Sequence, residues 1–117
     1  MDERLKKALE FANYRQTLNI QLHKAKIKTE SLLFIAKNGG SFHINQELIC
    51  FVNYLKQQEL TQAVILDSNN TPIQITDVDN FLEEITARYF EVTNDYLREY
   101  QTIKKSRDVK SIIKDVE

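Results

Sequence analysis

The chain has 117 residues, a hydrophobic fraction of 42% and a net charge of −1, which is enough apolar content for one modest core. Two glycines and one proline are too few for a collagen-like or linker-rich chain. Cys50 is the single cysteine and cannot form an internal disulfide, and no apolar run is long enough to span a bilayer. We therefore expect one ordered cytoplasmic domain over residues 1–117, not associated with a membrane, with a polar helical tail from about residue 104.

The small net charge hides a basic, acidic, basic order along the chain. Residues 1–37 carry a net charge of +4, residues 38–100 carry −7 and residues 101–117 carry +2. Segments of opposite charge attract each other, so the first segment is expected to pack near the middle one.

Residues 2–29 are predicted to form a long amphipathic helix. The same spacing of apolar residues continues to Lys37, so a longer helix stays an alternative. We place the end near residues 29–31 because residues 32–35 and 41–44 flank an Asn-Gly-Gly turn, which is typical of a β-hairpin. The apolar stripe recurs at three- and four-residue steps, as one buried helix face requires, and comprises Phe11, Tyr14, Leu18, Leu22, Ala25 and Thr29, extended backward by Leu5, Ala8, Leu9 and Ala12.

A short helix and a second hairpin follow. Asn45 opens the helix, because its side chain can accept hydrogen bonds from the free amides of the first turn. The second hairpin pairs residues 63–66 with residues 72–75 through an Asp-Ser-Asn-Asn turn. The first hairpin-and-helix segment, residues 32–55, thus aligns without a gap with the second, residues 63–86, which lies thirty-one residues later.

A long last helix is predicted to begin at Thr76, with Asp79 completing a capping box. Its apolar positions alternate four- and three-residue steps, which indicates packing along another helix, here the first one. This seam comprises Val78, Leu82, Ile85, Tyr89, Val92 and Tyr96.

A second apolar edge lies beside that seam. Phe90 and Leu97 are seven residues apart, with Tyr100 next to them. Because one packing partner needs only one stripe, this edge indicates either a wider core or a second partner. We expect Phe90, Leu97 and Tyr100 to form an oligomer or partner interface.

Few residues suggest chemistry. His23 and His43 have no supporting motif, and Cys50 is expected to be a small buried residue because nothing nearby would activate a thiolate. No metal-ligand spacing or phosphate-binding glycine loop is present, so we predict a protein that is not an enzyme and needs no cofactor. The charged residues at helical spacing in the last helix are interpreted as a solvated salt-bridge ladder; they are Glu84, Arg88, Glu91, Asp95 and Arg98. Turn or cap residues explain the possible cation ligands Asp67, Asn69, Asp77 and Asp79.

Basic side chains near both ends of the chain support a rival function. Lys24 and Lys28 are four residues apart on one helical face, and Lys104, Lys105 and Arg107 lie in the tail. These residues could contact phosphates, so a small nucleic-acid-binding accessory protein is the alternative.

A resemblance to other proteins extends over nearly the whole chain. It is carried especially by Asn38-Gly39-Gly40, Gln46–Leu55 and Phe81–Val109. The sequence resembles a small protein of the T-even-like contractile-tailed phages that infect marine cyanobacteria. The resemblance implies a phage-encoded protein in the host cell cytoplasm and carries no active site.

We therefore predict an α+β fold: long helix, β-hairpin, short helix, β-hairpin, long helix. The hairpins are expected to join in one small antiparallel sheet, because an isolated hairpin is marginally stable, and the two long helices to run antiparallel. The predicted function is a noncatalytic interaction or assembly protein that forms a homo-oligomer.

Overall fold

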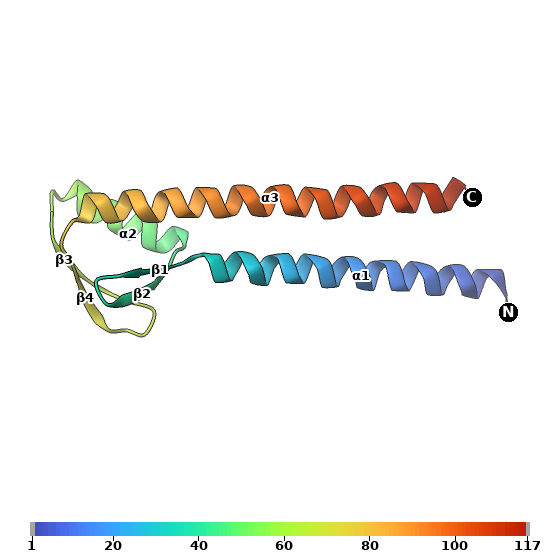
Figure 1. Cartoon of the computed structure of the whole chain (residues 1–117), viewed down its shortest axis with the longest axis horizontal. Coiled ribbons are helices and arrows are strands. Elements are labelled where there is room, and N and C mark those ends of the chain that lie inside the picture. Colours follow the sequence, from blue (N-terminus) through green and yellow to red (C-terminus); the bar gives the residue numbers. More distant parts are fainter. Residues whose placement is uncertain (1, 117) are drawn as a thin grey trace. The chain divides into compact units, whose positions relative to one another are not determined.

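The computed structural model describes the backbone of residues 2–116 and the side chains of residues 2–105. Its helices and strands follow the predicted α+β order (Figure 1). The chain divides into a hairpin unit, residues 30–94, and a helical unit, residues 1–29 and 95–117. The elements are α1 (Glu3–Leu32), β1 (Phe34–Lys37), β2 (Gly40–His43), α2 (Gln46–Gln57), β3 (Ala63–Leu66), β4 (Pro72–Ile75) and α3 (Val78–Val116).

The first hairpin has a shorter turn than predicted, so β1 begins later and β2 begins earlier in the sequence than expected. α1 ends at Leu32, within one residue of the end predicted near residues 29–31, and the alternative of a helix to Lys37 is wrong. Asn38 and Gly39 alone make the turn, with φ values of 51° and 85°. Two adjacent residues with positive φ are typical of the tight turn that suits the twist of a hairpin, and Asn-Gly is its preferred sequence. The strands pair from Phe34 opposite His43 to Lys37 opposite Gly40.

The second hairpin has the predicted strand bounds, with Ala63 opposite Ile75 and Leu66 opposite Pro72. Its turn spans residues 67–71, and is therefore longer than the first. The sequence offset between equivalent strands is therefore not the same throughout. β3 starts 29 residues after β1, whereas β4 starts 32 residues after β2.

The hairpins form two separate two-stranded sheets, so the prediction of one joined sheet is wrong. Polar contacts connect them instead. The Ser68 amide donates to the carbonyl oxygen of Ser41 at 2.9 Å, and the Asn38 side chain donates to the carbonyl oxygen of Gln74 at 2.9 Å. Gly40 lies so close to Ile73 that a Cβ atom at Gly40 would come within 2.5 Å of Ile73 Cγ1.

The core of the hairpin unit is formed by both hairpins, α2 and the first turns of α3. α2 begins as predicted, because Asn45 Oδ1 accepts a hydrogen bond of 2.8 Å from the Leu48 amide. Among the described side chains, the largest that are fully buried come from every one of these elements except β1 and β3. They are Phe42, Phe81, Ile44, Ile75, Ile85, Val52 and Val78.

α3 begins with a different cap from the predicted one. Asp77, not Thr76, accepts a hydrogen bond from the Asn80 amide at 3.0 Å. The predicted seam is confirmed at its buried positions Val78, Ile85 and Val92. Up to Val92 the seam packs in a core cluster with the hairpins and α2.

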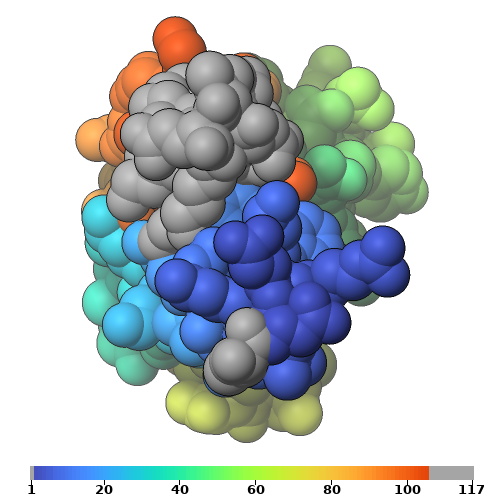
Figure 2. Space-filling view, turned by 90° about the vertical axis from the view of Figure 1, so that its right-hand side faces the viewer, coloured from blue at the N-terminus to red at the C-terminus, as the bar shows by residue number. Residues whose placement is uncertain are grey.

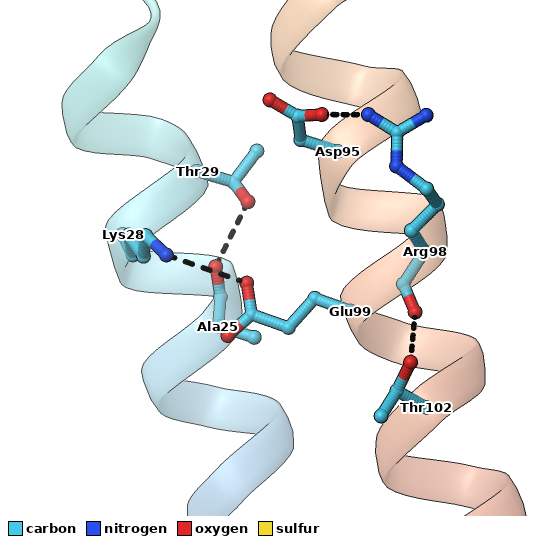
Figure 3. Close-up of polar contacts among 7 residues, drawn as sticks. All are labelled: Ala25, Lys28, Thr29, Asp95, Arg98, Glu99 and Thr102. Atoms are coloured by element: carbon cyan, nitrogen blue, oxygen red, sulfur yellow. Dashed lines mark hydrogen bonds and ion pairs between the residues drawn. The ribbon is translucent and has the colours of Figure 1, made fainter.

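In the helical unit, the facing segments of α1 and α3 run antiparallel (Figure 3). Ala25 and Thr29 are the buried residues of α1, and Lys28 Nζ lies 3.7 Å from Glu99 Oε2. This ion pair joins the basic first segment to the acidic middle segment, as the charge order predicts. The first turns of α1 lie at the surface (Figure 2, dark blue).

Candidate interaction surfaces

The residues best suited to chemistry are Cys50, His43 and His23. Cys50 is exposed, which corrects the prediction of a buried thiol. Two residues correspond to about 200° around a helix, so Cys50 points away from the face on which Val52 is buried. His43 lies against Phe34 with ring centroids 4.9 Å apart and ring planes tilted by 31°, and His23 is exposed on α1. Within the described residues, no three His, Cys, Asp or Glu side chains converge on a possible metal position.

Asp67 connects the two hairpins through its carboxylate. Its Oδ2 accepts a hydrogen bond from the Ser41 amide at 3.1 Å, and its Oδ1 accepts from the Asn69 and Thr71 amides at 2.9 Å each. The hydrogen bond from Ser41, followed by those from Thr71 and Asn69, lowers the pKa of Asp67 below 3.8, although burial opposes the shift. The residue is structural, as the sequence analysis predicts for this turn.

An Asp67→Asn substitution is expected to weaken the acid dependence of stability. Because the pKa of folded Asp67 lies below its ordinary value, its carboxylate contributes fully above about pH 4, and that contribution is lost as the pH falls through the lowered pKa. Thermal unfolding of both proteins from pH 7 to pH 2 measures this difference. Equal slopes for both proteins in the acid range would contradict the assignment.

Glu84 pairs across the hairpin unit rather than along its helix. Lys37 Nζ lies 2.8 Å from Glu84 Oε1, and the Asn80 side chain donates to the same oxygen at 2.8 Å. The hydrogen bond from Lys37 lowers the pKa of Glu84. The predicted ladder of charges along α3 is therefore wrong at Glu84, whereas the Asp95–Arg98 pair forms (Figure 3).

α1 carries apolar side chains on two opposite faces. Leu18 and Leu22 are half-buried on one face, which continues to the buried Ala25. Ile20 lies about 200° around the helix from both leucines, and it is exposed. We name the exposed side the far face of α1, defined by Leu5, Leu9, Ile20 and Ile27.

The sequence analysis placed Leu5 and Leu9 on the buried stripe, and the structure corrects this. Leu9 is nine residues before Leu18, which corresponds to half a turn of helix phase. Ile20 and Ile27 fit no position of the buried stripe. Their seven-residue separation was the signal that a second face exists.

The predicted interface residues of α3 are exposed in both units. Phe90, in the hairpin unit, is 58% exposed. Leu97 and Tyr100, in the helical unit, are 54% and 39% exposed. The Tyr100 ring meets Tyr96 edge to face at 6.4 Å, so its orientation is held by a neighbour on the same helix.

Two of the predicted phosphate-contacting lysines engage partners within the protein. Lys28 pairs with Glu99, and Lys104 Nζ lies 5.7 Å from the centroid of the Tyr100 ring. Lys24 and Lys105 are exposed. The side chain of Arg107 lies outside the described residues.

A hollow of about 460 Å³ opens in the hairpin unit between β2, β3 and the first turns of α2. Phe42 and Leu48 line its inner part, and the exposed Phe51, Val64 and Leu66 line its rim. This hollow is not apparent from the sequence, because its lining residues come together only when the two hairpins pack against each other. The alternation within β3 was the available signal, since it places Val64 and Leu66 together on the face opposite Ile65.

No helix, over its described residues, combines the length and the apolar character needed to cross a membrane. Comparison of the chain with protein families, curated proteins and solved structures found no match.

Proposed function

We propose that this chain is a noncatalytic assembly protein whose copies associate through their long helices. The exposed far face of α1 carries the proposal. Apolar side chains on two opposite faces of one helix indicate two packing partners, and only one face is buried within the helical unit.

The partner proposed for this face is α3 of a second copy, at the edge defined by Phe90, Leu97 and Tyr100. Charge supports the choice, because Glu3–Leu32 carries a net charge of +4 and residues 78–100 carry −4. Opposite net charges favour α1 against α3 over either helix against itself. The Lys28–Glu99 pair is an example of this attraction between the same two helices.

An Ile20→Glu or a Leu97→Glu substitution is expected to dissociate the oligomer. Burying an aliphatic side chain of this size contributes about 1.5–3 kcal/mol, so its loss alone weakens association by at least about tenfold. Light scattering over a concentration series measures the change. Thr102→Glu is the matched control, because Thr102 is exposed on α3 about 140° around the helix from Leu97.

Three results would count against this proposal. A wild-type chain that stays monomeric at high concentration would remove its basis, and equal dissociation by Thr102→Glu would show a general charge effect. Salt-sensitive retention of DNA or RNA that is lost in Lys24→Glu and Lys105→Glu variants would support the nucleic-acid alternative instead.

The biological setting belongs to the same proposal. The resemblance at Phe81–Val109 supports a phage-encoded protein that assembles in the cytoplasm of an infected bacterium. The amount of this protein in infected bacteria, measured over the course of infection, tests this setting.

A further inference from the structure

The free edges of the two sheets differ in how well they are protected. On β2, Ser41 donates its amide to Asp67 and its carbonyl oxygen accepts from Ser68. On β4, Pro72 has no amide hydrogen and the carbonyl oxygen of Gln74 accepts from Asn38. Proline and side-chain contacts of this kind prevent a sheet edge from pairing with another chain.

β3 contains no proline, and no contact of this kind from another described residue covers its free edge. In an antiparallel pair, residues that bond to the partner strand alternate with residues whose backbone groups point outward. The Asp67 amide donates to the carbonyl oxygen of Thr71, which continues the register of Ile65 opposite Ile73. The backbone groups of Val64 and Leu66 therefore point away from β4, along the free edge.

The side chains on this edge are also unusual for a free strand. Val64 is 64% exposed and Leu66 is 59% exposed. Residues 62–66 include no charged residue, whereas solvent-exposed edge strands are commonly protected by lysine or another charge.

We propose that β3 pairs antiparallel with β3 of a second copy, with Val64 of each copy opposite Leu66 of the other. In this register the outward amides and carbonyls of both residues satisfy each other. No charged residue lies opposite a charge of the same sign, because Asp67 of one copy lies opposite Ala63 of the other. The two-stranded sheet of each copy is marginally stable alone, and this pairing joins the two into one four-stranded sheet. The gain in stability favours a second copy of the chain as the partner of β3.

The hollow beside β3 supports the same arrangement. Val64 and Leu66 form part of its rim together with Phe51. Directly paired residues share one face of a sheet, so Val64 and Leu66 of the second copy join this apolar rim. This contact lies in the hairpin unit and does not depend on the helix contact of the proposed function.

Disulfide trapping tests the register. In a Cys50→Ser background, the double variant Val64→Cys/Leu66→Cys is expected to form a disulfide-linked dimer under mild oxidation, because paired residues have Cα atoms about 5.5 Å apart. Each single variant is expected to stay unlinked, since neither residue lies opposite itself. A double variant without crosslinks, or a single variant that crosslinks equally well, would overturn the proposal.

A charge on the edge tests the contact without cysteines. Val64→Lys is expected to raise the dissociation constant of this contact at least about tenfold, measured by light scattering in the Ile20→Glu background that removes the helix contact. Gln74→Lys is the matched control, because Gln74 is exposed on β4 of the same sheet. Equal weakening by both lysines would overturn the proposal.

These experiments test the β3 contact and the helix contact separately. If only the β3 contact exists, the Ile20→Glu variant still forms dimers and Val64→Lys dissociates them. If only the helix contact exists, Val64→Lys leaves association unchanged and the double-cysteine variant does not crosslink.

Discussion

Replacement of Phe81 by alanine is expected to lower the free energy of unfolding by about 3–5 kcal/mol, which is the usual cost of removing a buried phenylalanine ring. Phe81 is fully buried, and its ring meets Phe42 edge to face with centroids 5.1 Å apart. The substitution therefore removes apolar burial, an aromatic pair and the contact between α3 and the first hairpin. Urea unfolding followed by circular dichroism measures the loss.

Phe51→Ala is the matched control for this prediction. Phe51 is also a phenylalanine of the hairpin unit, but it is exposed, so its loss is expected to cost less than about 1 kcal/mol. Similar losses for both variants, or a loss below about 1 kcal/mol for Phe81→Ala, would show that the core is not centred on Phe81.

Gly40→Ala is expected to lower the free energy of unfolding by about 1–3 kcal/mol through overpacking. Its new Cβ atom would lie 2.5 Å from Ile73 Cγ1 and 2.9 Å from Ile73 Cδ1. Ile73 is buried, so its side chain has little room to move. The cost arises where the hairpins touch, and unfolding in urea again measures it.

A double-mutant cycle isolates this clash. Ile73→Ala removes the two Ile73 atoms that the new Cβ would meet and leaves only Asp67 Oδ2, at 3.3 Å, as a close neighbour. The Gly40→Ala/Ile73→Ala double variant is therefore expected to lose at least about 1 kcal/mol less than the sum of the single losses. Gly39→Ala is the control. Gly39 has no neighbouring atom within 4 Å of its Cβ position, and its cost comes from its φ of 85°, which Ile73→Ala cannot relieve. Additive losses in the Gly40 cycle would contradict the predicted contact.

Local signals predicted most of the fold. The Asp-Ser-Asn-Asn turn between residues 63–66 and 72–75 predicted the second hairpin with its observed strand bounds, and Asn45 caps α2 as expected. In the first hairpin, Asn38 and Gly39 favour a two-residue turn. The strands predicted for this hairpin flank a longer turn, so their bounds differ from the observed ones.

The remaining differences depend on contacts between residues far apart in sequence. Nothing near Asp67 indicates that its carboxylate reaches Ser41, 26 residues earlier, so the separation into two sheets was not predictable from periodicity. At Thr76, the capping-box pattern competed with the adjacent Asp77, which is the residue that caps α3.

The candidate surfaces were predictable to different extents. The exposure of Phe90 and Leu97 follows from their rotation away from the seam of α3. The far face of α1 was missed because Leu5 and Leu9 were assigned to the buried stripe, although Leu9 lies half a turn of helix phase from Leu18. The edge of β3 needed the structure, because its lack of protection is visible only when the contacts that cover β2 and β4 are known.

The hydrogen bond between Ser41 and Asp67 also bears on the order of folding. It closes a loop that contains all of α2, whereas each hairpin and α2 form from residues close together in sequence. Local elements of this kind form within microseconds, and contacts across longer loops follow because more chain entropy is lost in making them. We infer that the Asp67 carboxylate reaches Ser41 late, after both hairpins exist, and that this bond fixes how two independently formed hairpins meet.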